Sequence, residues 1–250
     1  MITSKVIAHR GASRLAPENT LAAFRKARDA GASWIEVDVA LSADGQAVIF
    51  HDEKLNRCSN GHGWLLNHTL AELQRLDAGS WFAAEFHNEQ IPTLEALLLW
   101  AAEQSINLNL EIKPVIGREA ETVDALVTAL QAAQARHNHI ASQLLLSSFN
   151  PLALTHVRAA LPTIPRALLT EAIPADAVLR LQQLDCEGLH FCAELVDQAA
   201  ILALNNSGFS VRAYTVNNTA AAGALIAMGV NAIFSDIPDL AITSAHIISD

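Results

Sequence analysis

The chain has 250 residues, of which 51% are hydrophobic and 17% charged, a length that suits one large α/β barrel or two small domains. Its formal net charge of -10 disfavours a nucleic-acid or anionic-membrane surface, although a few local cations can still bind a small anionic substrate. No stretch approaches the roughly 18–20 uninterrupted apolar residues that a membrane-spanning helix needs. The cysteines form no C-x-x-C pair and the start leaves no room for a secretory signal, which predicts a cytoplasmic protein.

Short β-branched runs alternate with Ala- and Leu-rich helical patterns along the chain. Strands are predicted at Val6–His9, Trp34–Ala40, Asn107–Ile112, Gln143–Ser148, Pro165–Leu169, Gly188–Phe191, Phe209–Val216 and Ala232–Ser235. Helices are predicted at Leu21–Ala30, Leu94–Gln104, Glu119–Arg136, Pro151–Ala160, Ala175–Leu184, Asp197–Asn205 and Thr219–Met228, with a last one from Asp239. Candidate N-caps precede three of these helices: Asn19 or Thr20, Asn150, and Asn217 or Asn218.

This alternation predicts an α/β fold, namely a (β/α)8 TIM barrel, with a doubly wound open sheet as the alternative. The segment "DGQAVIFHD" adds a short strand directly after the second one. Residues from about 55 to 92 then break the alternation with "SNGHG" and "DAGSWF". We expect them to form a small insertion within a single domain that spans residues 1–250.

Two predicted strands carry acids where a core residue is expected. Glu36 and Asp38 share one face of their strand, and Glu111 and Lys113 share one face of the next barrel strand, because side chains alternate along a strand. Inward carboxylates about 4 Å apart repel by roughly 4 kcal/mol at an effective dielectric near 20. A bound divalent cation offsets such repulsion, and an all-oxygen site suits Mg²⁺ or Ca²⁺. The alternative is that each acid pairs separately with a basic residue at the barrel rim.

Histidines end two further strand patterns. His9 and Arg10 lie in "VIAHRG", and His51 lies in "AVIFHD". Imidazole titrates near neutral pH, so two histidines beside a carboxylate cluster form a candidate acid/base pair. Arg10 and Lys113 add fixed positive charge suited to phosphate oxygens. This combination fits phosphoryl transfer better than glycoside hydrolysis, which needs carboxylates without the basic pair.

A set of sequence words from Ile7 to Asp239 resembles the glycerophosphodiester phosphodiesterase family, in its compact cytosolic bacterial form. The words, in order, are "AHRGASRLAPENTLAAF", "EVDVALSADGQAVIFHD", "NRCSNGHG", "DAGSWF", "IPTLEALL", "LEIKP", "LLSSFNP", "AYTVN" and "IFSDIPD". Each word is weak evidence by itself, but HRG, PENT, E-x-D, HD and E-I-K in this order are specific. The resemblance implies a divalent-metal-dependent (β/α)8 enzyme that hydrolyses glycerophosphodiesters, a small-molecule substrate, to sn-glycerol 3-phosphate and an alcohol.

The resemblance also implies residue roles. Glu36, Asp38 and Glu111 would hold the metal, His9 and His51 would act as general acid and base, and Arg10 and Lys113 would hold the phosphate. Glu18, Asn19, His190 and Tyr214 with Asn217 are secondary candidates; for Asn19 a helix N-cap and for Tyr214 an ordinary rim aromatic remain alternatives. The insertion around Trp64, Trp81 and Phe82 is expected to cover the site mouth and to influence which alcohol is accepted.

Three rival interpretations remain open. A phospholipase-type barrel acting on lysophospholipids would need an exposed apolar rim, and the sequence shows no clear one. A barrel that only binds phosphodiesters would be expected to lack a ligand acid or a histidine, and all of them are present. In the third, the acids and bases pair with one another. The sequence also leaves open which histidine is the base, whether a glycerol hydroxyl or water attacks, and whether the chain forms an oligomer.

Overall fold

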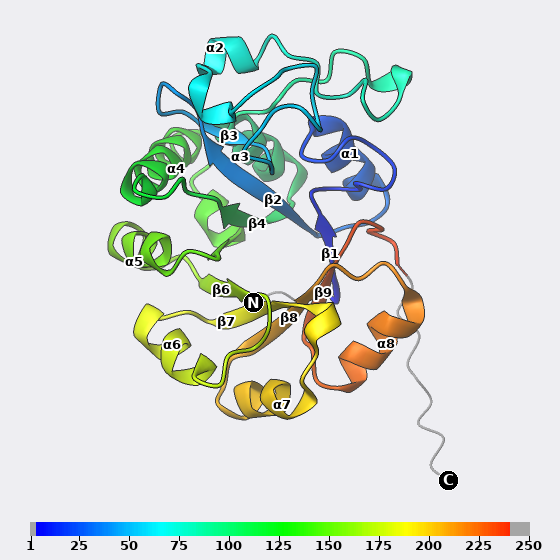
Figure 1. Ribbon diagram of the computed structural model, residues 1–250, viewed down its shortest axis with the longest axis vertical. Coiled ribbons are helices and arrows are strands. Elements are labelled where there is room, and N and C mark those ends of the chain that lie inside the picture. The colour runs from blue at the N-terminus through cyan, green and yellow to red at the C-terminus, as the bar shows by residue number, and fades with distance from the viewer. Residues whose placement is uncertain (1–3, 241–250) are drawn as a thin grey trace.

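The computed structural model describes residues 4–240, whose strands form a barrel surrounded by helices (Figure 1). The strands are β1 (Val6–His9), β2 (Trp34–Leu41), β3 (Ala47–Ile49), β4 (Asn107–Ile112), β5 (Leu144–Ser148), β6 (Arg166–Thr170), β7 (Gly188–Cys192), β8 (Ser210–Tyr214) and β9 (Ala232–Ser235). The α-helices are α1 (Leu21–Asp29), α2 (Leu70–Leu73), α3 (Leu94–Gln104), α4 (Glu119–Gln134), α5 (Pro151–Ala160), α6 (Ala177–Leu184), α7 (Gln198–Asn206) and α8 (Thr219–Ala227). Short 3₁₀ turns are η1 (Leu65–Asn67), η2 (Ala84–Phe86), η3 (Ile140–Gln143) and η4 (Ala193–Leu195).

The pairing of the strands closes the sheet on itself. Within residues 4–240 the sheet has nine strands in the order β1-β9-β8-β7-β6-β5-β4-β2-β3, and β1 pairs with β2 as well. Of these described strands, β3 alone runs antiparallel to its neighbour, β2, so the other eight form a closed parallel barrel. The predicted TIM barrel is confirmed, and the open-sheet alternative is wrong.

Most predicted element boundaries coincide with the observed ones, and the others differ by one or two residues. The strand predicted from Gln143 begins at Leu144, because the preceding residues turn as η3. The strand predicted to reach Val216 ends at Tyr214. The helix predicted from Asp239 lies outside the described residues, apart from Asp239, which is in a turn, and Leu240, which has no regular structure. No helix within residues 4–240 is long and apolar enough to span a lipid bilayer.

Side-chain alternation divides the barrel strands into two faces. Ile35, Val37 and Val39 of β2 point outward and are buried against α3 and α4, in one cluster with Leu97 and Leu126. A second buried cluster comes from side chains on the other face of the strands, which points into the barrel: Ile7, Trp34, Leu145, Ala167, Ala232 and Phe234. Because Trp34 begins its strand and Asp38 follows on the same face, the polar side chains lie toward the carboxyl end, where barrels of this kind carry their chemistry.

The insertion between β3 and α3 has a small core of its own. It extends from one side of the barrel and carries α2 (Figure 1). Its buried side chains are Phe50, Leu55, Cys58, Leu65, Leu73, Ala78 and Ile91, which pack with Val48 of β3. Antiparallel bridges between Val48 and Thr93 and between Lys54 and Trp64 tie the two ends of the segment to the sheet and to itself. The insertion is therefore fixed at the rim of the barrel.

Candidate active site

Three carboxylates converge at the carboxyl ends of β2 and β4. Asp38 and Glu111 are paired directly in the strand register, and Glu36 lies two residues before Asp38 on the same face. One oxygen atom from each of the three lies within 4.8 Å of the others. Glu36 and Asp38 are almost fully buried, so the predicted acidic cluster exists inside the barrel mouth.

The two cationic side chains beside this cluster contact Asp38 and Glu111 and leave one oxygen atom of Glu36 without a partner among the described residues. Lys113 Nζ lies 3.3 Å from Glu111 Oε1 and 3.7 Å from Asp38 Oδ1, and Arg10 Nε lies 3.4 Å from Asp38 Oδ2. Glu36 Oε1, by contrast, is buried without a hydrogen-bond partner among the described residues. The interpretation in which every acid pairs separately with its own basic residue is therefore wrong for Glu36, whereas an all-oxygen donor set of this kind fits a divalent cation.

Burial and mutual repulsion perturb the titration of these acids. Burial, followed by the charges of Asp38 and Glu111, raises the pKa of Glu36 well above its usual range. Burial and Asp38 likewise raise the pKa of Glu111 to about 7, although Lys113 opposes the shift. A cation bound among the oxygens would favour the ionised forms.

Each of the two predicted histidines is held by a carboxylate. His9 Nδ1 lies 2.7 Å from Asp236 Oδ1, and His51 Nδ1 lies 2.6 Å from Asp52 Oδ1. A carboxylate on Nδ1 fixes the tautomer and leaves Nε2 available. The Nε2 atom of His9 lies 4.0 Å from Glu36 Oε2, so this ring faces the carboxylate cluster.

Burial and neighbouring groups also shift the pKa of His51 and the pKa of Asp236, the carboxylate that holds His9. Burial, with the charges of Arg10 and Lys113, lowers the pKa of His51, although Asp38 and Asp52 oppose this. The neutral imidazole is therefore favoured at neutral pH. Burial by itself would raise the pKa of Asp236, but hydrogen bonds from His9, Asn217 and Ser13 bring it down to about 2. Asp236 is therefore ionised beside His9.

The loop after β1 brings Arg10 onto the cluster. The Arg10 backbone N–H donates to Glu36 Oε2 at 3.0 Å, and its Nη1 donates to Glu18 Oε1 at 2.7 Å. Gly11 has a φ of 83°, and a Cβ atom there would lie 2.8 Å from Ala23 on α1. Only glycine permits this close approach, which places the Arg10 side chain over the barrel mouth.

In the PENT motif, Asn19 contacts the carboxylate cluster and Thr20 caps α1. Asn19 Nδ2 donates to Asp38 Oδ2 at 2.8 Å, and Asn19 is 3% exposed. Thr20 is the N-cap of α1 and accepts from the Ala23 N–H. The N-cap alternative for Asn19 is wrong, and its side chain instead contacts the carboxylate cluster.

His190 and Tyr214 line a small cavity beside the cluster. This cavity, of about 40 Å³, is also lined by His9, Glu36 and Glu111. His190 is fully buried, its Nε2 accepts from Arg212 Nη1 at 3.2 Å, and burial lowers its pKa well below the usual range. The Tyr214 hydroxyl donates to the Thr170 carbonyl at 2.9 Å. The Tyr214 hydroxyl is thus engaged by the protein, whereas His190 Nδ1 is buried without a hydrogen-bond partner among the described residues.

Comparison with known proteins decides the family. A profile described as "Glycerophosphoryl diester phosphodiesterase family" matches residues 9–240. The chain belongs to this family. It is 34% identical to a glycerophosphodiester phosphodiesterase of Bacillus altitudinis over 242 residues, which covers 96% of this chain and 97% of that one.

Solved structures of phosphodiesterases have the same fold. A phosphodiesterase from Oleispira antarctica, solved in complex with the product sn-glycerol-3-phosphate, is 41% identical, covers 94% of both chains and superposes with a TM-score of 0.88. A glycerophosphodiester phosphodiesterase from Agrobacterium tumefaciens is 29% identical, covers 95% of this chain and 98% of that one, and superposes with a TM-score of 0.78. The family match therefore extends to the full barrel.

Three polar residues of this family member were missed as candidates from the sequence. Asp52 and Asp236 hold the histidines, and Arg57 of the insertion contacts Asp52. Asp52 directly follows His51, and Asp236 directly follows the last barrel strand, which must lie beside the first one in a closed barrel. Both acids could therefore have been proposed from the sequence as partners of the histidines, whereas no sequence feature near Arg57 indicates its partners.

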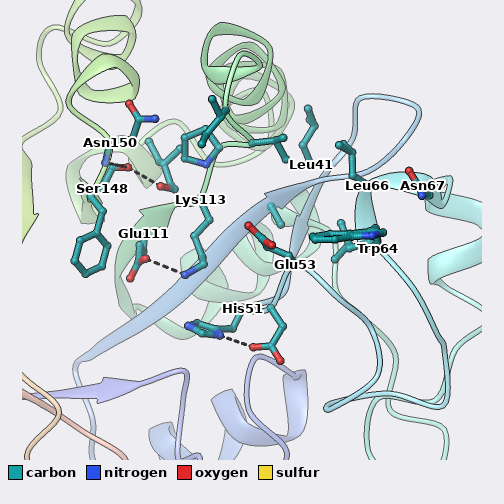
Figure 2. A pocket seen from close by; sticks show the side chains of 18 of the residues that line it. Leu41, His51, Glu53, Trp64, Leu66, Asn67, Glu111, Lys113, Ser148 and Asn150 are labelled. Carbon is teal, nitrogen blue, oxygen red and sulfur yellow. Dashed lines mark hydrogen bonds and ion pairs between the residues drawn. The ribbon is translucent and has the colours of Figure 1, made fainter.

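A cleft of about 770 Å³ opens beside the cluster (Figure 2). His51, Glu111 and Lys113 line one part of it, and Trp64 of the insertion lines another. Among the described residues, Trp81 and Phe82 are not part of its lining; their rings pack edge-to-face with centroids 5.7 Å apart. Of the aromatic residues expected at the site mouth, Trp64 is therefore the one at this cleft.

Proposed function

We propose that this protein hydrolyses glycerophosphodiesters to sn-glycerol 3-phosphate and an alcohol, with a divalent cation held by Glu36, Asp38 and Glu111. The observation that carries the proposal is the geometry of those three acids, whose oxygen atoms converge within 4.8 Å of one another between two histidines and two cationic side chains. Membership of the phosphodiesterase family supports it, as does the product bound to the Oleispira antarctica relative.

The cation would be Mg²⁺ or Ca²⁺, because all three candidate ligands offer oxygen atoms. When bound, it supplies positive charge that polarises a phosphate oxygen and lowers the pKa of a coordinated hydroxyl. Arg10 and Lys113 add to this charge from the protein, Arg10 as a planar fork and Lys113 as a point charge. The two side chains hold the phosphate against the barrel mouth.

The two histidines move the proton. His51, whose lowered pKa favours the neutral ring, accepts the proton of the attacking oxygen through Nε2. His9, held through Nδ1 by the ionised Asp236, donates a proton to the departing alkoxide. Glu18 and Asn19 orient Arg10 and Asp38, while His190 and Tyr214 shape the small cavity on the His9 side.

The decisive assay measures glycerol 3-phosphate released from glycerophosphocholine and glycerophosphoethanolamine. We expect release with Mg²⁺ or Ca²⁺, loss of release with EDTA, and recovery when the cation is restored. Glu36→Gln and Asp38→Asn should abolish both release and cation binding measured by calorimetry. Cation-supplied protein that releases no glycerol 3-phosphate from either diester would refute the activity, and cation binding without turnover would favour the barrel that only binds phosphodiesters.

Two further assignments accompany this function. We infer a single domain over residues 1–250, because the insertion begins and ends on the barrel sheet.

We also place the protein in a reducing, cytoplasmic compartment, since Cys58, Cys186 and Cys192 are all free thiols. Limited proteolysis that separates a stable fragment, or cell fractionation that recovers the protein outside the cytoplasm, would contradict these assignments.

A further inference from the structure

The small cavity beside the carboxylate cluster is lined by three buried polar side chains, Glu36, Asn109 and His190. Among the described residues, Glu36 Oε1, Asn109 Oδ1 and His190 Nδ1 have no hydrogen-bond partner. Buried polar atoms are nearly always paired, because an unpaired one loses the hydrogen bonds that it made with water. Three unpaired atoms on residues around one cavity therefore indicate that the cavity binds a small polar molecule.

The barrel strands bring these three side chains together. Glu36 of β2 pairs with Asn109 of β4 in the strand register, so both lie on the inner face of the barrel. The Asn109 Nδ2 atom donates to Ser147 Oγ at 3.0 Å, which leaves Oδ1 of this amide as an acceptor. His190 comes from β7, and its ring packs against Phe234 with the ring centroids 4.9 Å apart.

The partner of the other ring nitrogen fixes the tautomer of His190. Arg212 Nη1 lies 3.2 Å from His190 Nε2. Because a guanidinium only donates, Nε2 accepts, and the proton of the neutral ring is on Nδ1. Burial and the charge of Arg212 lower the pKa of His190 well below its usual range, which keeps the ring neutral. His190 therefore offers an N–H donor, whereas Asn109 and Glu36 offer acceptors.

The size and charge of the cavity select the molecule that binds there. A volume of about 40 Å³ holds about one or two water molecules, each of which takes up about 30 Å³ in the liquid. An anion is disfavoured by the carboxylates of Glu36 and Glu111 on the same cavity. One water can accept from His190 Nδ1 and donate to both acceptors, which is the usual number of partners for a buried water.

We propose that a water molecule in this cavity joins His190 Nδ1 to Asn109 Oδ1 and Glu36 Oε1, which makes His190 a positioning residue for the Glu36 carboxylate. Glu36 is then held through both oxygens, because the Arg10 backbone N–H donates to Oε2. A carboxylate oxygen has two lone pairs, so Glu36 can accept from the water and still bind a cation. A ligand that is oriented beforehand binds the cation more tightly. This inference rests on the proposed function, in which Glu36 is a cation ligand.

Cation affinity in the absence of substrate tests the positioning role. Ca²⁺ or Mg²⁺ is titrated by calorimetry into the full-length protein and into His190→Gln, His190→Asn and His139→Gln. The introduced glutamine can accept from Arg212 but has no donor at the Nδ1 position, whereas the asparagine amide nitrogen lies close to that position. We expect cation affinity to weaken about 10- to 100-fold in His190→Gln and to recover most of this loss in His190→Asn. The exposed His139 serves as the control, and His139→Gln should bind as the wild type does. Wild-type affinity in His190→Gln would overturn the positioning role.

Electron density tests the water directly and needs no variant. Crystals of the wild-type protein with the cation, at a resolution that shows ordered water, should contain a peak about 2.7–3.2 Å from His190 Nδ1 and from Asn109 Oδ1. The peak should be present without substrate and missing in Asn109→Leu. A dry cavity would overturn the inference. A peak seen only with bound sn-glycerol 3-phosphate would assign the position to a substrate hydroxyl and would also overturn it.

Kinetics distinguish positioning from a general structural role. In His190→Gln we expect the loss to appear mainly as a rise in the cation concentration that gives half-maximal release of glycerol 3-phosphate, and less in kcat at saturating cation. A loss confined to kcat would overturn the positioning role. Hydrolysis by a protein whose cavity is dry overturns this inference and leaves the phosphodiesterase function standing. Ordered water with weakened cation binding in His190→Gln, but no hydrolysis of any diester by the wild type, supports the inference and refutes the function.

Discussion

Arg57, in the insertion, forms a two-pronged ion pair with Glu18, in the loop after β1. Its Nη1 lies 2.7 Å from Glu18 Oε2, and its Nη2 lies 2.9 Å from Glu18 Oε1. The same guanidinium donates to both oxygens of Asp52, the carboxylate that holds His51. Glu18 in turn holds Arg10. One side chain thus supports both a histidine and a phosphate-binding arginine.

Arg57→Ala should therefore lower kcat about 10- to 100-fold, the range seen when a partner that orients an active-site group is removed. The pH dependence of kcat/KM should also change, because Asp52 would lose its fixed position beside His51. Arg57→Lys should recover only part of the activity, since a lysine cannot bridge two carboxylates in this geometry. Arg180→Ala, which removes an exposed ion pair with Asp176, is the matched control. Equal effects of Arg57→Ala and Arg180→Ala would show that Arg57 has no such role.

Cation binding should stabilise the fold. At a free concentration of about 100 times Kd, a ligand specific to the folded state adds roughly 2.7 kcal/mol, or about 5–10 °C in Tm for a chain of this length. Differential scanning calorimetry at pH 8 with and without Ca²⁺ or Mg²⁺ measures this shift. Glu36→Gln should lose most of it, while Glu103→Gln, an exposed change on α3, should keep it.

Without a cation, stability should fall as the pH rises. The folded-state pKa of Glu111 is about 7, raised from 4.5, so the folded chain binds more protons than the unfolded one between these values. Ionisation of this buried group therefore costs stability from about pH 5 upward, and fully above pH 7. Glu36→Gln should raise the Tm of the cation-free protein at pH 8 by a few degrees, because one repelling charge is gone. A cation-free Tm that does not change between pH 5 and pH 8 would contradict this account.

Replacing Asp52 should move the acidic limb of the rate profile. The hydrogen bond that His51 Nδ1 donates to Asp52 raises the pKa of His51 against the stronger effect of burial. In Asp52→Asn the pKa of His51 should fall further, so the limb that reports its neutral form shifts to lower pH. At the same time kcat should drop about 10- to 100-fold because the ring is no longer held in one tautomer. A limb that stays in place would remove His51 from the role of base.

Alanine at either histidine should lower kcat by about 10²–10⁴-fold with folding intact. Cation binding measured by calorimetry serves as the control, because neither ring is among the three candidate ligands. An unfolded variant would be recognised by circular dichroism. Near-normal turnover in both variants would refute the acid/base assignment.

Strand order and the acidic cluster could be predicted because both depend on local spacing. Glu36 and Asp38 share a face in any strand, and parallel strands in a barrel bring their carboxyl ends to one rim. The spatial neighbours of Asp38 and Glu111 follow from the same reasoning, and the strand register pairs the two.

The remaining parts of the site depend on loops, whose path cannot be predicted from local sequence patterns. Arg57 meets Glu18 only after the insertion has folded back over the rim, a separation of 39 residues. Ile116 and Trp64 likewise become walls of one cleft through loop geometry. For His190, the strand position was predictable, but its hydrogen bond with the buried Arg212 was not, because that pair depends on packing inside the barrel.

The separate core of the insertion has an evolutionary consequence. A segment that buries its own apolar residues and joins the sheet at its two ends behaves as a cassette. We expect that recombination between relatives can replace it without repacking the eight barrel strands, provided the new segment carries an arginine equivalent to Arg57 that pairs with Glu18. Substrate range would then diversify by exchange of this cassette, while the hydrolytic centre is inherited unchanged.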